Sequence, residues 1–330
     1  MPIVTLTMNP AIDIAAGADR IRPTSKTRCT PPRFDPGGGG INAARTIAAL
    51  GEPVTAIFPA GGPSGRQLED LVRDAGVPMR SIPIAGHTRE NLAVTDNETG
   101  DQFRFVFPGP RVTAPELHLC LSEIERAAVG SRYVVASGSL PPGVPDDLYQ
   151  VLADLLRDLG VPLILDTSGA ALRAVRRGVL LLKPSVRELA ELTGHPLPDR
   201  KSQFAAAREL ILAGVCEIVV VSLGAGGALA VTRHDDEWFP SLEVTVRSGI
   251  GAGDAMVGAM TVGLSRGYPL DDAVRLGIAA ATAALTTPGT RPGHPARIAE
   301  LYQQEPETRP SCFAPAGSGS PETPVSQRRT

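Results

Sequence analysis

The chain has 330 residues, of which 42% are hydrophobic, so it can bury a sizeable core as one large domain or two. Its 32 basic and 35 acidic side chains nearly balance and no basic run stands out, which argues against a nucleic-acid-binding protein. No stretch approaches the roughly 20 apolar residues that cross a bilayer, and the sequence shows no secretory signal pattern. We therefore expect a cytoplasmic globular protein with no role at a membrane.

The cysteines predict neither a metal site nor a disulfide framework. Cys29, Cys120, Cys216 and Cys312 lie far apart, and no two of them form a C-x-x-C pair. Such spacing is typical of reduced thiols in a reducing compartment.

Short β-branched runs alternate with longer helical patterns along most of the chain, which indicates an α/β protein with a mostly parallel sheet. Helices are expected where alanine- or leucine-rich segments stop at a glycine or proline. The predicted core strands are Ile3–Leu6, Val54–Phe58, Tyr133–Ala136, Pro162–Asp166, Val179–Lys183 and Ile218–Ser222, and the predicted helices include Gly40–Leu50, Leu148–Leu159 and Ala273–Leu285.

Two segments depart from this alternation, at about residues 13–35 and 87–107. In the second, Asn91–Thr95 and Gln102–Phe107 read as strands joined by a turn at Asn97–Gly100. The segments fit a small β-layer that could close over a cleft as a lid, or an ordinary surface hairpin. From about Glu305 the chain is rich in Pro, Ser and Gly with few aliphatic residues, so residues 305–330 are predicted to be a disordered tail.

Gly251, Ala252, Gly253 and Asp254 directly precede a helical run. Small residues leave the first backbone N–H groups of a helix open, and the helix dipole adds positive potential there, so the turn can hold an anion. A carboxylate in the same turn can accept a proton from an attacking hydroxyl, which is the arrangement that phosphoryl transfer needs. The alternative is that Asp254 only caps the helix.

Four glycines, Gly37–Gly40, run into another predicted helix that carries Asn42 in its first turn. Consecutive glycines let a ligand approach the backbone, and an Asn amide can bond sugar hydroxyls. A flexible turn is the alternative. The run is not a Walker P-loop, because no Gly-Lys-Ser/Thr follows, and it is not a dinucleotide fingerprint after a strand.

Three further loops follow predicted strands, and ligands of parallel sheets collect at that edge. Ser137–Gly143 and Val221–Gly227 could bind ligands or be plain turns. Lys183–Glu188 opens a helix, and Ser185 with Glu188 could simply form a capping box.

In this order and spacing, the motifs resemble the two signature regions of the PfkB-type, ribokinase-like carbohydrate kinases, over Met1 to about Tyr302. Within that family the chain is most similar to the ribokinase-type 6-phosphofructokinases, in Arg28–Thr30, Gly37–Asn42, Ala56–Gly62, Ser137–Gly143 and Val257–Thr261. In related 1-phosphofructokinases and tagatose-6-phosphate kinases, lysine usually occupies the position of Gly39. The resemblance therefore implies ATP-dependent phosphorylation of fructose 6-phosphate at the 1-hydroxyl.

The resemblance also implies the fold: a ribokinase-like three-layer α/β sandwich in residues 1–304, with the two irregular segments forming a small β-sheet lid. Such lids commonly pair in a homodimer, so a lid-to-lid homodimer is expected.

For the sugar phosphate, the resemblance implies Asp254 as the catalytic base, with Gly251, Ala252 and Gly253 as the anion hole. Arg89, with Lys26 and Arg28 from the lid, would neutralise the substrate phosphate. Lys26 and Arg28 could reach the phosphate bound by the other subunit of the dimer. The sugar itself would be bound by Asp13, Gly38, Gly39, Gly40, Asn42 and Ser137.

For ATP, the resemblance implies a site along one sheet edge, made of Lys183, Ser185, Ser222, Leu223, Gly224, Ala225, Gly226, Gly227, Thr282 and Thr287. Glu188 would hold Mg²⁺ through water. Oxygens near Ser248, Ile250, Ala284, Gly289 and Arg291 would form a site for a monovalent cation such as K⁺.

The chain departs from the family pattern at two positions. Ser185 replaces the asparagine of the N-x-x-E motif, and Gly249 replaces a threonine ahead of the anion hole. Two alternatives therefore stay open: a kinase for tagatose 6-phosphate, fructose 1-phosphate or another sugar, and a degenerate kinase that senses sugar phosphate or ATP.

Overall fold

The computed structural model of the protein describes residues 1–304; the predicted tail, with Cys312, lies outside them. A nine-stranded sheet, in the order β13-β12-β11-β10-β9-β8-β1-β4-β5, forms the centre of the molecule. From β5 through β11 every neighbouring pair is parallel, and β12 and β13 add an antiparallel edge. The strands of this sheet are β1 (Ile3–Leu6), β4 (Val54–Ala60), β5 (Met79–Pro83), β8 (Tyr133–Ser137), β9 (Leu163–Asp166), β10 (Val179–Leu182), β11 (Cys216–Ser222), β12 (Ala228–Val231) and β13 (Asp236–Phe239).

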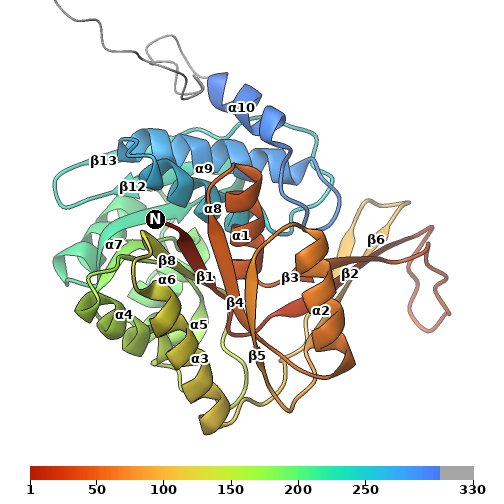
Figure 1. Ribbon diagram of the computed structural model, residues 1–330. Coiled ribbons are helices and arrows are strands. Elements are labelled where there is room, and N and C mark those ends of the chain that lie inside the picture. Colours follow the sequence, from red (N-terminus) through yellow and green to blue (C-terminus); the bar gives the residue numbers. More distant parts are fainter. Residues whose placement is uncertain (305–330) are drawn as a thin grey trace, which may run out of the picture.

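Helices cover both faces of the sheet, which gives the three layers predicted for this chain (Figure 1). One helical layer contains α1 (Gly39–Ala49), α2 (Gly62–Asp74), α8 (Ala252–Ser265), α9 (Leu270–Leu285) and α10 (Pro295–Gln303). The other contains α3 (Ala114–Ala128), α4 (Leu148–Asp158), α5 (Gly169–Arg173), α6 (Val186–Thr193) and α7 (Arg200–Leu212).

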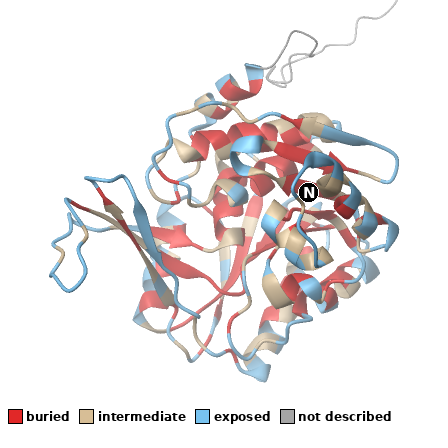
Figure 2. Ribbon diagram, turned by 180° about the vertical axis from the view of Figure 1, so that it is seen from behind, coloured by how far each residue is buried: buried red, intermediate tan, exposed pale blue. Residues whose placement is uncertain are grey.

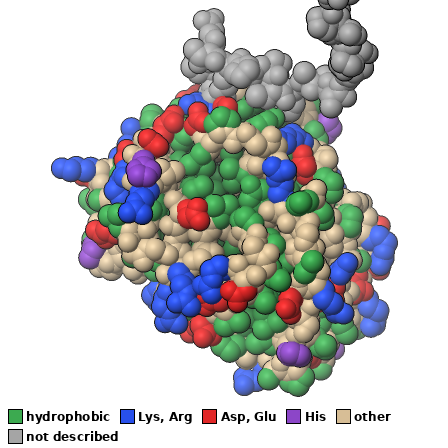
Figure 3. All heavy atoms as spheres, turned by 60° about the vertical axis from the view of Figure 1, so that its left-hand side comes forward, with side chains coloured by type: hydrophobic (Ala, Val, Ile, Leu, Met, Phe, Trp, Pro, Cys, Tyr) green, Lys and Arg blue, Asp and Glu red, His purple; other side chains and the backbone are tan. Residues whose placement is uncertain are grey.

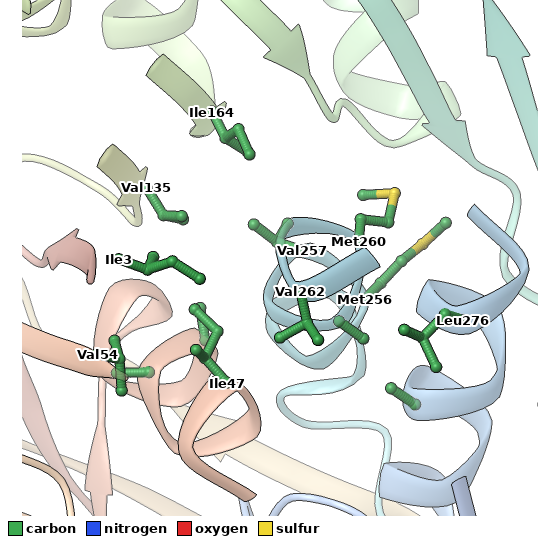
Figure 4. Close-up of a cluster of buried hydrophobic side chains, with 14 of the residues drawn as sticks. Ile3, Ile47, Val54, Val135, Ile164, Met256, Val257, Met260, Val262 and Leu276 are labelled. Atoms are coloured by element: carbon green, nitrogen blue, oxygen red, sulfur yellow. The ribbon is translucent and has the colours of Figure 1, made fainter. Parts of the chain in front are cut away.

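The core strands are mostly apolar because both of their faces are covered. In β8, Val135 joins the core on the side of α8, whereas Val134 and Ala136 join the core on the side of α4. Figure 4 shows the first core, where Ile3, Val135 and Ile164 of the strands face Val257 and Met260 of α8. The six predicted strands are confirmed, with bounds shifted by at most a few residues.

The two irregular segments form a separate four-stranded sheet, in the order β3-β2-β6-β7. Its strands are β2 (Ala11–Ala18), β3 (Arg33–Gly37), β6 (Arg89–Asp96) and β7 (Gln102–Phe105). This lid sheet projects from one side of the molecule, and much of its surface is exposed, whereas the inner strands of the central sheet are mostly buried (Figure 2). The expected sandwich with a small β-sheet lid is therefore confirmed.

Candidate active site

The carboxyl ends of β8, β9, β10 and β11 meet the first turn of α8, and this meeting point brings together most of the predicted site residues. Helix α8 begins at Ala252, with Gly251 as the residue before it, and Asp254 lies in the first turn. The Asp254 side chain caps no backbone N–H of this helix; its Oδ2 accepts a 2.9 Å hydrogen bond from Asn42 Nδ2 instead. The simple helix-cap alternative does not describe Asp254.

The surroundings of Asp254 shift its pKa in two opposing ways. Burial raises the pKa of Asp254, while the hydrogen bond from Asn42, the charge of Lys183 and the Ser137 hydroxyl act in the opposite direction. The two sets of effects oppose each other: burial disfavours the charged carboxylate, and its polar and cationic neighbours favour it.

A second buried carboxylate, Asp166, lies beside this group at the end of β9. It forms an ion pair with Lys183, at 3.3 Å between Oδ1 and Nζ, and both side chains are largely buried. Burial raises the pKa of Asp166 to about 6; Lys183 opposes this rise, and the negative charges of Asp254 and Glu188 add to it. The strand-end position of Asp166, at the edge where ligands of parallel sheets collect, was a signal that could have singled it out.

The glycines before α1 have a packing role. A Cβ at Gly39 would lie 2.1 Å from Ser137 Oγ, and one at Gly40 would lie 2.5 Å from the Leu6 carbonyl oxygen. The run is therefore not a loose turn: its lack of side chains lets the start of α1, with Asn42, reach the ends of β1 and β8.

A cavity of about 760 Å³ extends from the first turn of α8 toward the loop that follows β11. Its volume lies in the range of small-molecule sites. It is lined by Ser222, Gly224, Ala225 and Gly227 of that loop, by Ala252 and Gly253 of α8, by Thr282, and by apolar side chains such as Val246, Met256 and Ile278. Leu223, Gly226 and Thr287 do not line it.

The side of the molecule that carries β12 and β13 is hollowed, with hydrophobic side chains in the hollow and charges of both signs around it (Figure 3). Ser241 Oγ and Trp238 Nε1 bond the carbonyls of Ala225 and Gly226, which fixes the loop after β11. Backbone groups of this loop are thus held in place beside an apolar cavity.

Ser185 and Glu188 form the capping box that was one of the two expectations for them. Glu188 Oε2 accepts hydrogen bonds from the backbone N and the Oγ of Ser185, at 2.7 and 2.8 Å, and Ser185 Oγ accepts one from the Glu188 N–H. The backbones of Ser185 and Ser222 form an isolated parallel β-bridge. Because Ser222 lines the cavity, the start of α6 lies beside it.

The lid contributes a second group of predicted residues. Asp13 of β2 accepts a 2.9 Å hydrogen bond from Asn91, and burial raises its pKa, against the effect of this bond. Arg89 begins β6 and donates to the carbonyls of Asn9 and Phe107, while its buried Nε has no hydrogen-bond partner among the described residues. Lys26 and Arg28 are exposed in the loop between β2 and β3, at the outer end of the lid sheet, away from α8 (Figure 1).

The residues predicted for a monovalent cation lie in the loop before α8, in the last turn of α9 and in the loop that follows α9. The Ser248 N–H donates to the Leu285 carbonyl, and the Thr287 hydroxyl lies 2.8 Å from the Ala284 carbonyl oxygen and 2.6 Å from that of Arg291. Gly289 lies against the lid: a Cβ there would meet the Arg33 guanidinium and the Asp35 carboxylate. Thr287 was expected near the nucleotide base. Its hydroxyl instead contacts backbone carbonyls at the end of α9 and in the following loop, and the residue does not line the cavity.

An α/β sandwich with a lid, an open helix N-terminus and a buried carboxylate in its first turn define a phosphotransferase. Residues 4–297 match the model of the pfkB family carbohydrate kinases, and the chain belongs to this family.

Named relatives support the same assignment. The chain is 57% identical over 288 residues to the ATP-dependent 6-phosphofructokinase isozyme 2 of Mycobacterium tuberculosis, covering 87% of this chain and 85% of that protein. It is also similar to the crystal structure of phosphofructokinase-2 from Escherichia coli in complex with substrates and products, with a TM-score of 0.87 and 39% identity, covering 92% of this chain and 99% of that one. The potassium complex of the same Escherichia coli enzyme matches with a TM-score of 0.87 and 40% identity, covering 91% and 98%.

Proposed function

We propose that the protein is an ATP-dependent 6-phosphofructokinase, which transfers the γ-phosphoryl group of ATP to the 1-hydroxyl of fructose 6-phosphate and forms fructose 1,6-bisphosphate. The observation that carries the proposal is the Asp254 carboxylate, held by Asn42 in the first turn of α8 at the end of the cavity. The related 6-phosphofructokinases support this choice of substrate.

In the proposed mechanism, Asp254 accepts the proton of the 1-hydroxyl as the hydroxyl oxygen attacks the γ-phosphorus. The bond between the γ-phosphorus and the oxygen that bridges it to the β-phosphorus breaks, and ADP leaves. The N–H groups of Gly251, Ala252 and Gly253 hold the transferred group, aided by the positive end of the helix dipole. Asp13 and Asn42 position the sugar. The cavity that reaches from Gly253 to the loop after β11 takes the nucleotide.

Carboxylates near this point fit a hard divalent cation. Within residues 1–304, no three acidic, histidine or cysteine side chains converge as a direct ligand set, so an ion held mostly by water and phosphate fits better than one enclosed by protein. Glu188, with Asp166, would hold Mg²⁺ through water, and Mg²⁺ there would neutralise charge on the phosphates. The carbonyls of Ala284 and Arg291, which both lie close to the Thr287 hydroxyl, supply the oxygen ligands that K⁺ prefers, and the potassium-bound relative supports this site.

The role of Arg89 is testable with two substrates. Arg89 lies beside Asp13, and its guanidinium would supply charged donors to the 6-phosphate, so Arg89→Ala should raise KM for fructose 6-phosphate about 10- to 100-fold, the loss expected for charge-assisted hydrogen bonds. KM for unphosphorylated fructose should change far less. Steady-state kinetics with both sugars tests this, and Arg20→Ala, at an exposed lid arginine paired with Glu98, is the matched control. Equal effects of Arg89→Ala on both sugars would refute the phosphate-binding role.

The lid also supports the proposed homodimer. Phe34, Phe103, Phe105, Val106 and Phe107 are 40% to 61% exposed on or beside the lid sheet, and an apolar group of this size commonly marks an interface. Phe105→Asp should convert the dimer to monomer in sedimentation velocity experiments, because a charge would be buried without a partner. Leu212→Asp, at a leucine of α7 that is even more exposed than Phe105, should leave the oligomeric state as it is. A Phe105→Asp protein that still sediments as a dimer would place the interface elsewhere.

A further inference from the structure

Arg45 is a buried arginine whose position connects three parts of the site. It lies on α1, three residues after Asn42 and therefore on the same helix face, and only 7% of its surface is exposed. Its Nη1 lies 2.8 Å from the Thr290 carbonyl oxygen, 3.1 Å from Thr290 Oγ1, and 3.3 Å from both the Pro36 carbonyl oxygen and Asn42 Oδ1. Burial of a charged group is costly, and hydrogen bonds to these acceptors offset the cost of burying the Arg45 guanidinium.

The contacts of Arg45 determine which way the Asn42 amide points. A guanidinium can only donate hydrogen bonds and an ionised carboxylate can only accept them, whereas an amide has one end of each kind. Because Asn42 lies between Arg45 and Asp254, its oxygen must face Arg45 and its NH₂ must face Asp254. Without Arg45, only the Asp254 carboxylate would orient the amide, and the cost of the reverse orientation, in which the amide oxygen faces the carboxylate, would fall.

The same guanidinium also joins the lid to the loop after α9. Pro36 belongs to lid strand β3, where its neighbour Asp35 pairs with Arg33 and accepts a long hydrogen bond from the Thr290 N–H. The geometry of Asn42 thus depends on a cation whose other partners come from the lid and from the loop at Thr290.

We propose that Arg45 is a positioning residue of the phosphoryl-transfer site, which acts through Asn42 by directing its amide NH₂ group toward the Asp254 carboxylate. The inference rests on the proposed role of Asp254 as the base. It predicts that Arg45 influences the transfer step although it reaches neither sugar nor nucleotide.

The test compares kcat, KM for ATP and the pH dependence of kcat in Arg45→Met and Arg45→Lys. Arg45→Met should lower kcat about 10- to 100-fold, as expected for a lost hydrogen bond to a charged group, with KM for ATP nearly unchanged. Activity requires ionised Asp254, and a reversed amide would disfavour that form, so the acidic limb of the profile should move to higher pH. The charged groups that face Asp254, which are Lys183, Asp166, Asp13 and Arg104, stay in place. Arg45→Lys, which keeps a donor, should restore part of kcat and of the profile.

A double-substitution cycle separates positioning from general damage. In an Asn42→Ala background, Arg45→Met should cost less than about threefold in kcat, because residues that act through one another are not additive. Arg266→Met is the matched control: Arg266 also joins the α8 region to the end of α1, through Glu52 and the Leu50 carbonyl, and its loss should lower Tm without moving the acidic limb.

The outcomes are distinguishable. Two results would overturn the positioning role while leaving the proposed function intact. One is that Arg45→Met lowers kcat equally in the original chain and in the Asn42→Ala background. The other is that a folded Arg45→Met protein keeps the acidic limb of its kcat profile at the original pH. Absence of phosphoryl transfer by the unsubstituted chain would overturn the proposed function and this inference with it.

Discussion

Asp254→Asn should lower kcat for fructose 6-phosphate phosphorylation by at least ~10²-fold, the contribution expected of a general base. The amide has nearly the same shape as the carboxylate but cannot accept the proton of the sugar hydroxyl. The affinities for ATP and for fructose 6-phosphate should be retained, because the cavity lining is otherwise unchanged. ADP release with a panel of sugars measures the first quantity, and calorimetric titration measures the second.

Stability distinguishes this outcome from unfolding. Burial raises the pKa of Asp254, so this group stabilises the folded state at low pH, and that contribution is lost as pH rises through its folded-state pKa. The Asn variant is neutral at every pH, so at pH 7 its free energy of unfolding should equal or exceed that of the original chain. A folded variant with kcat within tenfold of the original would mean that another group is the base. Equal inactivity of both proteins on every sugar, with binding retained, would favour the sensor alternative.

Six strands of the central sheet could be predicted from the sequence because they are covered on both faces and therefore appear as mostly apolar runs. The strands β5, β12 and β13, which form the two ends of the sheet, were not predicted, and β5 and β13 include exposed residues. The lid was harder. The strands β6 and β7 were expected from their turn, but β2 and β3, with the sequences AIDIAAGA and RFDPG, were seen only as an irregular segment. Alanine, glycine and proline are weak strand formers, so these strands depend on pairing within the lid rather than on their own preference.

The site residues that the sequence indicated are those carried by local motifs. Asp254 and Asn42 were found in this way, and the structure brings them into contact although they are far apart in the chain. Asp166 was missed although its position at the end of a predicted strand was a signal. Asn91 and Arg45 were not found, because each acts through a residue that is distant in the chain: Asp13 for Asn91 and Thr290 for Arg45. A spacing pattern along the chain contains no information on such pairs.

Gly227→Ala should both destabilise the protein and weaken ATP binding. Gly227 has φ 89° and ψ −133°, a backbone conformation open to glycine and strained by roughly 1–3 kcal/mol for other residues. A Cβ there would also lie 2.0 Å from the Phe239 carbonyl oxygen and under 3 Å from backbone atoms of Pro240 and Ser241. Backbone atoms cannot rotate away, so the methyl group would have to push β12 from β13.

This displacement would reach the nucleotide cavity, because the cavity is lined by Gly227 and by Ser241 and Leu242, which follow β13. We expect a loss of about 3 kcal/mol or more in the free energy of unfolding, from strain and overpacking together, and at least a tenfold rise in KM for ATP. Thermal unfolding and ATP titration at saturating sugar phosphate measure the two effects. Gly160→Ala is the matched control. Gly160 follows α4 with φ +69°, and no atom lies within 4 Å of a Cβ added there. This variant should therefore lose only the roughly 1–2 kcal/mol of left-handed backbone strain, and its KM for ATP should be unchanged. If the two variants lost the same stability and neither changed KM, the loop after β11 would not be the rigid wall of the nucleotide site that its contacts imply.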